Sequence, residues 1–269
     1  MTTDFCKYHG LGNDFILIDR RGYGNIPPEV TKRICSRRTG VGADGILALY
    51  DYDGLRMRVF NSDGSTADMC GNGLRCFVAW LINELGIAYE PMTILTDAGP
   101  QHCIPHVGSK GQVTGVTVNL GPAKFKPEVA ISIQNERYTG IPMTLGNPHF
   151  VILRPARDGE AAIMGPKLST HTQFAHGANI EWLEIVDSTH ANLVVYERGA
   201  GLTLACGTGG GGAAATGVQL GLLASDTELN IRLPGGVLRY RVSPDFSSVF
   251  MTGPVEKVYA ANLSGSIDN

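Results

Sequence analysis

Short apolar runs bounded by turn residues recur along the whole chain and predict β-strands. The run 55–60 alternates apolar and basic residues, which is typical of a strand with one buried face. The predicted strands are 15–19, 46–50, 55–60, 92–96, 113–119, 149–153, 180–185, 191–196, 227–233, 238–242 and 249–252. The chain is therefore expected to be rich in sheet.

Three segments carry helical patterns instead. Residues 28–38 predict a short helix with a proline in its first turn. Residues 74–85 are apolar on most faces and stop at Gly86, as expected of a buried central helix. Residues 210–220 stop at Gly221 in the same way but are richer in glycine and alanine. Many strands around long helices favour an α+β fold over a doubly wound parallel sheet.

Two segments of the chain repeat one pattern. In 60–73 and in 196–209 an aromatic residue lies ten positions before a cysteine, and Gly-X-Gly follows the cysteine. Upstream, the run that begins at Asn13 resembles the one at Asn147, and Gly-Ala-Asp44 resembles Gly-Ala-Asn179. Three motifs in the same order, at a nearly constant separation, indicate an internal duplication of about half the chain.

The duplication predicts two pseudo-symmetric domains, each a mixed β-sheet or barrel wrapped around a central helix. The first domain is expected to span 1–110 and to carry Cys70, and the tail 261–269 can rejoin it. The second is expected to span 111–260 and to carry Cys206. The turn-rich stretch 97–111 is the expected crossing between them.

Composition narrows the class of partner. The chain has 269 residues, 43% of them hydrophobic, so two domains can each bury a core. A net charge of −3 without a basic run argues against nucleic acid and favours a small-molecule ligand. No stretch approaches the roughly 20 apolar residues of a membrane span, and the start lacks a secretory signal, so the cytoplasm is expected.

The two duplicated cysteines are candidate catalytic residues. Cys70 and Cys206 each precede a predicted helix, where free backbone N–H groups and the helix dipole are expected to stabilise a thiolate and lower its pKa. The glycines leave room for a ligand carboxylate to approach the amides of the next two residues. If the two halves face each other, one sulfur removes an α-proton and the other returns one from the opposite side, which inverts a stereocentre. No pyridoxal cofactor is then required.

The other four cysteines have no such setting. In a chain of this length they are expected to be reduced, buried thiols rather than a disulfide framework. They are Cys6, Cys35, Cys76 and Cys103.

At these motifs the chain resembles the diaminopimelate epimerase family. The matching segments are 9–15, 60–64, 69–77, 146–149, 196–201 and 205–209, and the likeness extends over nearly the whole chain. The resemblance implies an isomerase that converts LL- to meso-2,6-diaminopimelate in lysine and peptidoglycan biosynthesis. It also implies that neither cofactor nor metal takes part, and that two cysteines act in a cleft between pseudo-symmetric domains.

Site residues follow from the same resemblance. Cys70 matches the family's proton donor and Cys206 its proton acceptor, and the roles exchange with reaction direction. His149 and Glu197 match residues that tune the cysteine pKa values, and Tyr259 matches a contact of a homodimer. Substrate-binding positions are matched by Asn13, Asn61, Gly71, Asn72, Asn147, Asn179, Glu197, Arg198, Gly207 and Thr208.

The chain departs from the family at two places. Gly45 stands where some members have a glutamine that contacts the substrate. Gly210 and Gly211 stand where many have alanine and cysteine, which makes four glycines in a row at a helix start. Such a run is expected to lower helix propensity and to loosen closure of the site.

Related and unrelated alternatives remain open. Proline racemases and hydroxyproline epimerases share the two-cysteine logic but typically have histidine at the position of Asn72, and phenazine-biosynthesis isomerases lack the cysteine pair. A dinucleotide-binding loop is conceivable at 207–212 with Asp226, although the surroundings lack βαβ alternation. A metal site at His102, Cys103 and His106 would rest on one cluster alone.

Overall fold

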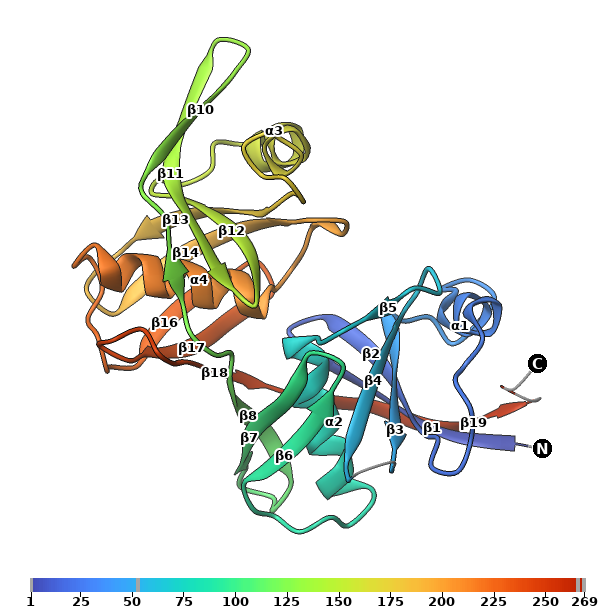
Figure 1. Ribbon diagram of the computed structural model, residues 1–269. Coiled ribbons are helices and arrows are strands. Elements are labelled where there is room, and N and C mark those ends of the chain that lie inside the picture. Colours follow the sequence, from blue (N-terminus) through green and yellow to red (C-terminus); the bar gives the residue numbers. More distant parts are fainter. Residues whose placement is uncertain (1, 52–53, 265–266, 268–269) are drawn as a thin grey trace. The chain divides into compact units, whose positions relative to one another are not determined.

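The computed structural model describes residues 2–51, 54–264 and 267 (Figure 1). The chain divides into two compact units, Met1–Val118 with Gly253–Asn269, and Asn119–Thr252. The first boundary between the units therefore lies after Val118, later than the expected boundary at residue 110. The second lies after Thr252, earlier than the expected boundary at residue 260. Residues 265–266 and 268–269 of the expected rejoining tail lie outside the described residues.

The first unit is a sheet around one helix. The N-terminal strand β1 (Thr2–Gly10) pairs antiparallel with β2 (Asn13–Asp19) and with β19 (Glu256–Ser264), which accounts for the return of the C-terminal segment to this unit. Next to β2 runs the parallel strand β3 (Gly45–Tyr50). The other strands are β4 (Arg56–Asn61), β5 (Thr66–Ala67), β6 (Met92–Thr96), β7 (Gly99–Val107) and β8 (Val113–Asn119).

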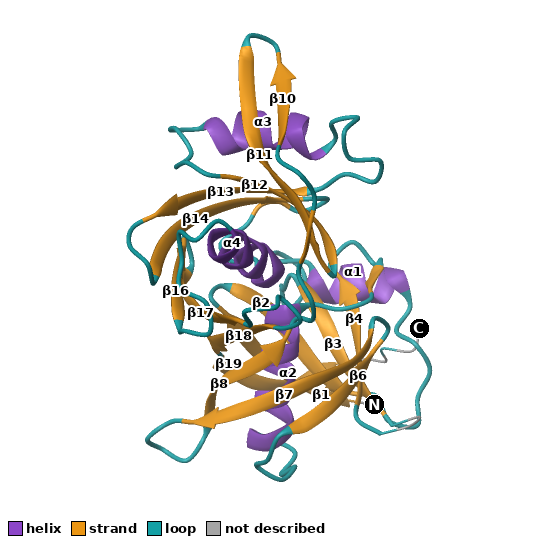
Figure 2. Cartoon of the chain, turned by 60° about the vertical axis from the view of Figure 1, so that its left-hand side comes forward, coloured by secondary structure: helices purple, strands orange, loops and turns teal. Residues whose placement is uncertain are grey.

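Two helices complete this unit. The helix α1 (Pro28–Cys35) covers one face of β3 with Val30 and Ile34. On the other side α2 (Gly71–Asn83) lies among the strands, and its residues from Asn72 to Leu81 are all buried (Figure 2). That burial accounts for the apolar composition on most faces of 74–85 and confirms the central helix.

The second unit repeats the plan. Its strand β12 (Asn147–Ile152) pairs antiparallel with β11 (Glu136–Leu145) and parallel with β13 (Asn179–Ile185), which pairs antiparallel with β14 (His190–Glu197). The remaining strands are β9 (Lys124–Phe125), β10 (Val129–Ile133), β15 (Gly201–Leu202), β16 (Leu229–Leu233), β17 (Gly236–Val242) and β18 (Val249–Pro254). The helices are α3 (Glu160–Ser169) and α4 (Gly207–Gln219).

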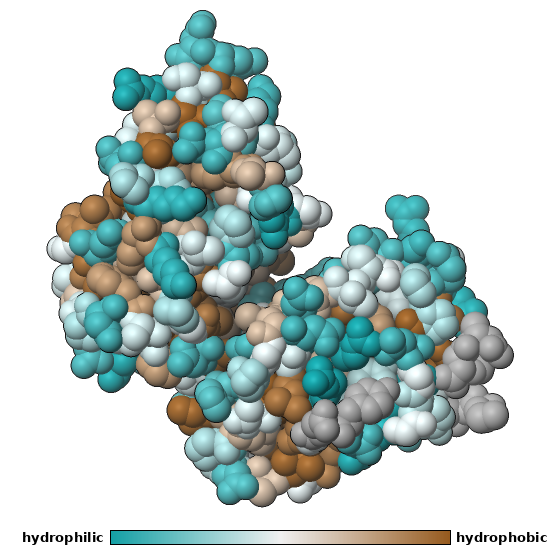
Figure 3. Space-filling view, in the orientation of Figure 1, coloured by the Kyte–Doolittle hydropathy of each residue, from teal (hydrophilic) through white to brown (hydrophobic). Residues whose placement is uncertain are grey.

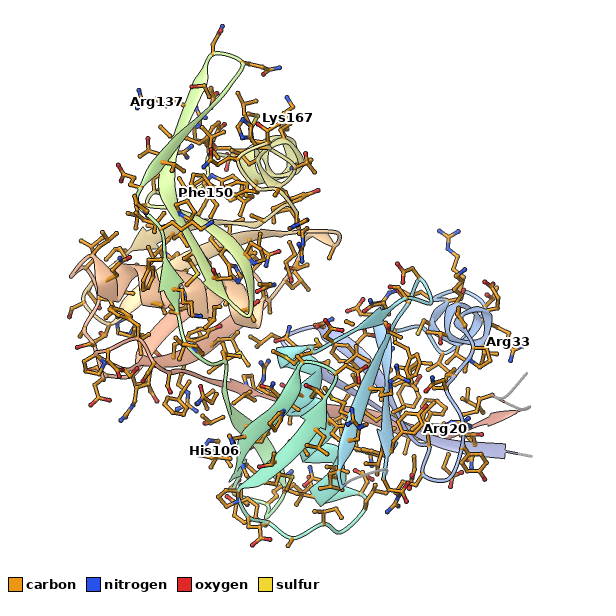
Figure 4. The ribbon with its side chains drawn as sticks, viewed as in Figure 1. Arg20, Arg33, His106, Arg137, Phe150 and Lys167 are labelled. Carbon is orange, nitrogen blue, oxygen red and sulfur yellow. The ribbon has the colours of Figure 1, made fainter. Side chains whose placement is uncertain are left out.

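The two faces of the central sheet of this unit pack against different helices. Phe150 and Trp182 lie in an apolar cluster with Met164 and Leu168 of α3, and Figure 4 shows Phe150 between β12 and this helix. Because side chains alternate across a strand, the odd-numbered residues of β12 and β13 point to the opposite face. That face packs against α4, which the curved strands surround in Figure 2. The expected α+β fold, with a helix inside each sheet, is confirmed.

The strand register corrects one detail of the duplication. Phe15 pairs with Gly45, and His149 pairs with Asn179. Since Phe15 and His149 each lie two residues after the matching asparagine, Asn179 is equivalent to Gly45, and its assignment to Asp44 is wrong by one residue. The loops before β3 and β13 hide this shift in the sequence.

Several elements differ from those predicted. The stretch 97–111, expected to be a crossing, contains β7, which pairs with β6 and with β8. As a consequence 113–118 belongs to the first unit. Each central helix starts three residues before its predicted start, because the cysteine is the N-cap.

Other elements carried no clear signal. The helix α3 holds Gly165 and Pro166, and β10 is a short strand with an exposed residue at every second position. Figure 4 labels Arg137 on the hairpin that β10 and β11 form, and Lys167 on α3. Neither element has a long apolar run.

The surface mixes residue types. Figure 3 shows hydrophilic and hydrophobic residues interspersed on the visible face. On β19 two neighbouring apolar side chains, Val258 and Tyr259, are 51% and 39% exposed. Among the described residues no helix is both long and apolar enough to cross a bilayer.

Candidate active site

The two duplicated cysteines are the N-caps of the two central helices. Cys70 has extended backbone angles, φ −138° and ψ 115°, and its Sγ accepts a hydrogen bond of 3.4 Å from the backbone N–H of Gly73. Cys206 repeats this arrangement with φ −120°, ψ 113° and a bond of 3.3 Å from the N–H of Gly209. A sulfur thus occupies the place that an Asp or Ser oxygen takes at ordinary helix starts.

Glycine at the third helical position provides space for this cap. A Cβ on Gly73 would lie 3.4 Å from the Cβ of Cys70, and one on Gly209 would lie 3.1 Å from the Sγ of Cys206. The amides at the two helix starts are those of Gly71 and Asn72, and of Gly207 and Thr208. Free N–H groups at a helix start favour an anion.

In the first unit a chain of polar side chains leads from α2 to the sheet. Asn72 donates from Nδ2 to Oδ1 of Asn13 at 3.1 Å, and Asn13 donates from Nδ2 to Oδ2 of Asp44 at 2.7 Å. Asp44 in turn accepts from Arg37 at 2.6 Å. The structure therefore brings Asn13 and Asn72 together at the start of the helix. It places Asn61 at the end of β4, where its Nδ2 donates to Ser65 Oγ at 2.9 Å.

The carboxylate of Asp14 anchors the same cluster. Burial acts to raise its pKa, but hydrogen bonds from Arg37 and Lys7 outweigh burial and hold the pKa at about 2. Lys7 lies 2.8 Å from this carboxylate. Asp14 is thus ionised at neutral pH, and it neutralises two cations beside Asn13.

In the second unit the residues predicted for the site converge on one side of the sheet. His149 lies with Nε2 2.7 Å from Oδ1 of Asn147, and its Nδ1 lies 2.7 Å from Oε1 of Glu181. Asn179 accepts from the backbone N–H of Arg198 at 2.8 Å. Asn147, Asn179 and His149 are therefore held by hydrogen bonds within this unit.

Glu197 lies at the end of β14, next to the second cysteine. Its Oε1 accepts from Thr203 Oγ1 at 2.5 Å. Its negative charge raises the pKa of the Cys206 thiol. Arg198 follows it, donating from Nη1 to the carbonyl of His176 at 2.6 Å, and its side chain is exposed. The sequence placed Glu197 in the site but gave no sign of Thr203.

The predicted lowering of the thiol pKa is wrong for Cys206. Burial raises the pKa of this thiol well above its ordinary value, and the charges of Glu197 and Glu181 raise it further. The N–H of Gly209 lowers it, as the helix-start argument requires, but this effect is the smaller one. Cys206 is only 3% exposed, which agrees with burial as the main cause of its raised pKa.

Glu181 is the main site residue that sequence reasoning missed. It is fully buried on β13, with no exposed side-chain surface. The available signal was a carboxylate at an inward-facing position of a predicted buried strand, which is uncommon unless the group is paired. Tyr259 contributes to neither cluster: it lies on β19 opposite Lys7, with its ring 5.9 Å edge-to-face from Phe5.

The alternative sites have unfavourable geometry. On β7, His102 and His106 bond to Thr93 and Thr117, whereas the adjacent Cys103 is 1% exposed on the other face of the strand. In the described part of the chain no three metal-ligating side chains come together.

The glycines at 209–212 lie inside α4 and are buried, so they form no open phosphate loop. All six cysteines lie in the described part of the chain, and none forms a disulfide.

Comparisons with known proteins agree on one family. A sequence profile described as diaminopimelate epimerase matches residues 5–126 and 142–258. The diaminopimelate epimerase of Synechococcus elongatus is 36% identical, over 98% of this chain and 99% of that protein. That of Nitrosospira multiformis is also 36% identical, over 98% of this chain and 99% of that protein.

Solved structures share the fold at lower identity. A Bacillus anthracis phenazine biosynthesis protein of the PhzF family has a TM-score of 0.77 at 17% identity, covering 98% of this chain and 99% of its own. A probable proline racemase from Agrobacterium radiobacter has a TM-score of 0.74 at 13% identity, covering 97% and 93%. Both are similar to this chain in architecture.

Proposed function

Because the chain belongs to the diaminopimelate epimerase family, we propose that it interconverts LL- and meso-2,6-diaminopimelate, a step of lysine and peptidoglycan biosynthesis. Membership of this family makes the protein an isomerase. The observation that carries the proposal is the pair of cysteine N-caps, Cys70 and Cys206, each beside the first backbone amides of a helix. We propose that these amides bind the substrate carboxylate, next to a sulfur.

The proposed reaction moves one proton onto the protein and one off it. A cysteine thiolate removes the α-proton, and the electron pair of the broken C–H bond spreads onto the substrate carboxylate. Backbone amides at a helix start stabilise that charge where it develops. The thiol of the other cysteine then delivers its proton to the opposite face of the carbon, so the two sulfurs end with exchanged protonation states.

The roles of the cysteines follow the reaction direction. We assign Cys70 as proton donor and Cys206 as proton acceptor for the direction from LL to meso. Cys206 must first lose its own proton, and we propose that the carboxylate of Glu197, whose charge acts on this thiol, receives it. His149 and Glu197 are proposed to tune the thiol pKa. The charge of Glu197 acts on Cys206 directly, whereas His149 bonds to Glu181, whose charge also acts on this thiol.

Polar side chains of both units are proposed to bind the substrate. A molecule with two ammonium and two carboxylate groups needs amide, carboxylate and guanidinium partners. The exposed guanidinium of Arg198 and the half-buried amides of Asn13, Asn61 and Asn147 have these chemistries. The other proposed positions are Gly71, Asn72, Asn179, Glu197, Gly207 and Thr208.

The proposal extends to the state of the protein in the cell. We expect a homodimer, with Tyr259 and its exposed neighbour Val258 at a dimer contact. The biosynthetic role favours the cytoplasm, and the net charge of −3 gives no reason to expect a nucleic-acid partner.

The test is conversion by purified, reduced protein. Incubation with LL-diaminopimelate should yield the meso isomer on chiral chromatography, and L-proline should remain unchanged. Cys70→Ala and Cys206→Ala should each lower the rate by at least about three orders of magnitude, as expected when a catalytic acid or base is removed.

The matched control is Cys76→Ala, a buried cysteine of the same helix as Cys70. This variant should retain activity. Racemisation of proline in place of diaminopimelate, or wild-type rates in either cysteine variant, would contradict the proposal.

A further inference from the structure

We propose that Glu181 is a positioning residue that fixes the His149 ring and, through it, turns the amide group of Asn147 toward a substrate carboxylate. The ligand named here rests on the proposed function. The hydrogen-bond chain itself is a property of the free protein, so it can be tested without substrate.

Glu181 and His149 form a pair on the face of the sheet that packs against α4. They belong to the neighbouring parallel strands β12 and β13, and neither has exposed side-chain surface. Nδ1 of His149 lies 2.7 Å from Oε1 of Glu181. Oε2 of Glu181 is buried with no hydrogen-bond partner among the described residues, so His149 is the principal partner of this carboxyl group.

Hydrogen bonds at both ring nitrogens hold the His149 side chain in one orientation. Nε2 of His149 lies 2.7 Å from Oδ1 of Asn147, and an amide oxygen only accepts, so this orientation of the Asn147 amide requires a hydrogen on Nε2. The other ring nitrogen shares one proton with Glu181, whichever atom holds it. Both nitrogens are thereby engaged, and the ring can neither flip nor change tautomer without breaking a hydrogen bond.

The fixed ring in turn fixes Asn147. Because Oδ1 accepts from the ring, the NH₂ group of Asn147 is the end that remains available to a ligand. Asn147 is half-buried, whereas His149 is 1% exposed. An NH₂ group donates two hydrogen bonds and suits a carboxylate, whereas the opposite orientation would present an oxygen and repel it.

The fold itself does not require this pair. A Cβ on Gly209 would lie 3.0 Å from Oε1 of Glu181, and one on the equivalent Gly73 would lie 3.0 Å from Cδ2 of Leu47. Leu47 therefore fills in the first unit the place that Glu181 fills in the second. The strand register makes Phe15 the equivalent of His149. The first unit packs with two apolar residues where the second carries a buried acid and a histidine.

Burial of the pair His149 and Glu181 is unfavourable for the stability of the second unit. Burial raises the pKa of Glu181, and the charge of Glu197 raises it further, while His149 lowers it. The Cys206 Sγ would lie 3.1 Å from the same Cβ on Gly209 that lies 3.0 Å from Oε1 of Glu181. Burying an ionisable pair seldom improves stability over apolar residues of similar volume, so a role in the site accounts better for its presence.

The experiment compares Glu181→Gln, Glu181→Leu and Glu184→Gln. Glutamine can donate from its amide to Nδ1 and keep the ring and Asn147 in place, whereas leucine cannot. Glu184 lies on the same strand and bonds to Asn192, so its glutamine variant is the matched control. Circular dichroism and thermal unfolding establish that each variant is folded.

Histidine-selective ¹⁵N NMR reads the ring directly, with His149→Phe identifying the signal. We expect Nε2 to carry its hydrogen in the wild type, Glu181→Gln and Glu184→Gln, and to lose this fixed state in Glu181→Leu. In the epimerase assay, Glu181→Leu should lower kcat/KM by about ten- to a hundredfold, chiefly through a higher KM, whereas Glu181→Gln should stay within about threefold.

Two results would overturn the inference. One is an unchanged His149 spectrum in a folded Glu181→Leu variant. The other is a Glu181→Gln variant that loses as much kcat/KM as Glu181→Leu while its ring signal stays in place. If the wild type shows the fixed ring but does not turn over diaminopimelate, the proposed function fails and the positioning of His149 stands.

Discussion

At the scale of single residues, the environment of Cys206 matters more than its helix-start position. The N–H of Gly209 stabilises a thiolate, but burial and two carboxylates favour the neutral thiol. Cys70 has the same cap and is half-buried rather than buried. The two sulfurs therefore meet different surroundings although their motifs are copies.

This contrast predicts the effect of Glu197→Gln. Removing the negative charge beside Cys206 should lower the pKa of its thiol, because that charge is second only to burial among the causes that raise it. The rate of alkylation of Cys206 by iodoacetamide, followed by mass spectrometry across pH, should reach its midpoint at a lower pH than in the wild type. The matched control is Asp187→Asn, an exposed acid on the same unit.

An unchanged or higher midpoint in Glu197→Gln would show that Glu197 does not act on this thiol. The wild-type midpoint should itself lie above the ordinary value for cysteine. Epimerisation by Glu197→Gln should also be slower, because the proposed receiver of the thiol proton is gone.

At the scale of elements, the four-glycine run in α4 is explained by what surrounds each glycine. A Cβ on Gly210 would lie 2.2 Å from the hydroxyl of Tyr240, which donates to the carbonyl of Gly207 at 2.9 Å. A Cβ on Gly212 would lie 2.9 Å from Sδ of Met143. The expected loss of helix propensity is real for the isolated segment, and close approach of the sheet compensates for it.

The same substitution at two of these glycines should therefore have different effects. Gly210→Ala should lower the free energy of unfolding by about 2 kcal/mol or more, because a ring buried against the helix cannot move away. Gly212→Ala should change it by less than about 1 kcal/mol, because the flexible end of Met143 can shift and alanine favours the helix. Urea unfolding of both variants gives the comparison, and equal losses would contradict the account.

Helices and strands were predictable from the sequence where a single local pattern, such as an uninterrupted apolar run, dominated the segment. The apolar composition of 74–85 gave the central helix, and 92–96 was predicted with the bounds that β6 has. The segment 99–107 was missed because Gly99, Pro100 and Pro105 are turn formers, yet here they lie in a strand. Its pairing with β6 and β8 is a tertiary effect that local sequence does not contain.

The site was predictable to the extent that it is duplicated. The cysteine motifs stand out because both copies are visible in the chain. The pair His149 and Glu181 cannot be recognised as a repeat in the same way, because its equivalents in the first unit, Phe15 and Leu47, are apolar. Recognising it needs the strand register, which the one-residue shift before β13 conceals.

At the scale of the whole molecule, the two units share one architecture and differ in the residues that pack against the central helix. Each unit carries a cysteine-capped helix inside its own sheet. The first unit has apolar residues beneath its helix, and the second has an ionisable pair. Duplication accounts for what the units share, and we attribute the difference to the proposed positioning of Asn147 by His149 and Glu181.

Restoring the first unit's residues in the second tests this view. The double variant His149→Phe/Glu181→Leu should fold with a free energy of unfolding equal to the wild type or higher, as replacement of a buried pair by apolar residues often allows. His149→Phe alone should lose about 3 kcal/mol, because it leaves a buried carboxyl group without its partner. Denaturant unfolding separates the two, and a double variant less stable than either single variant would contradict the equivalence of the units.

The central claim is that two cysteines exchange the α-proton of diaminopimelate with solvent. The most direct measurement is proton NMR of LL-diaminopimelate incubated with the reduced protein in deuterated water. The account predicts that the α-proton signal disappears as meso product forms, with deuterium at the inverted carbon. A folded, reduced protein that leaves the α-proton in place, or that forms the meso isomer without deuterium, would contradict it.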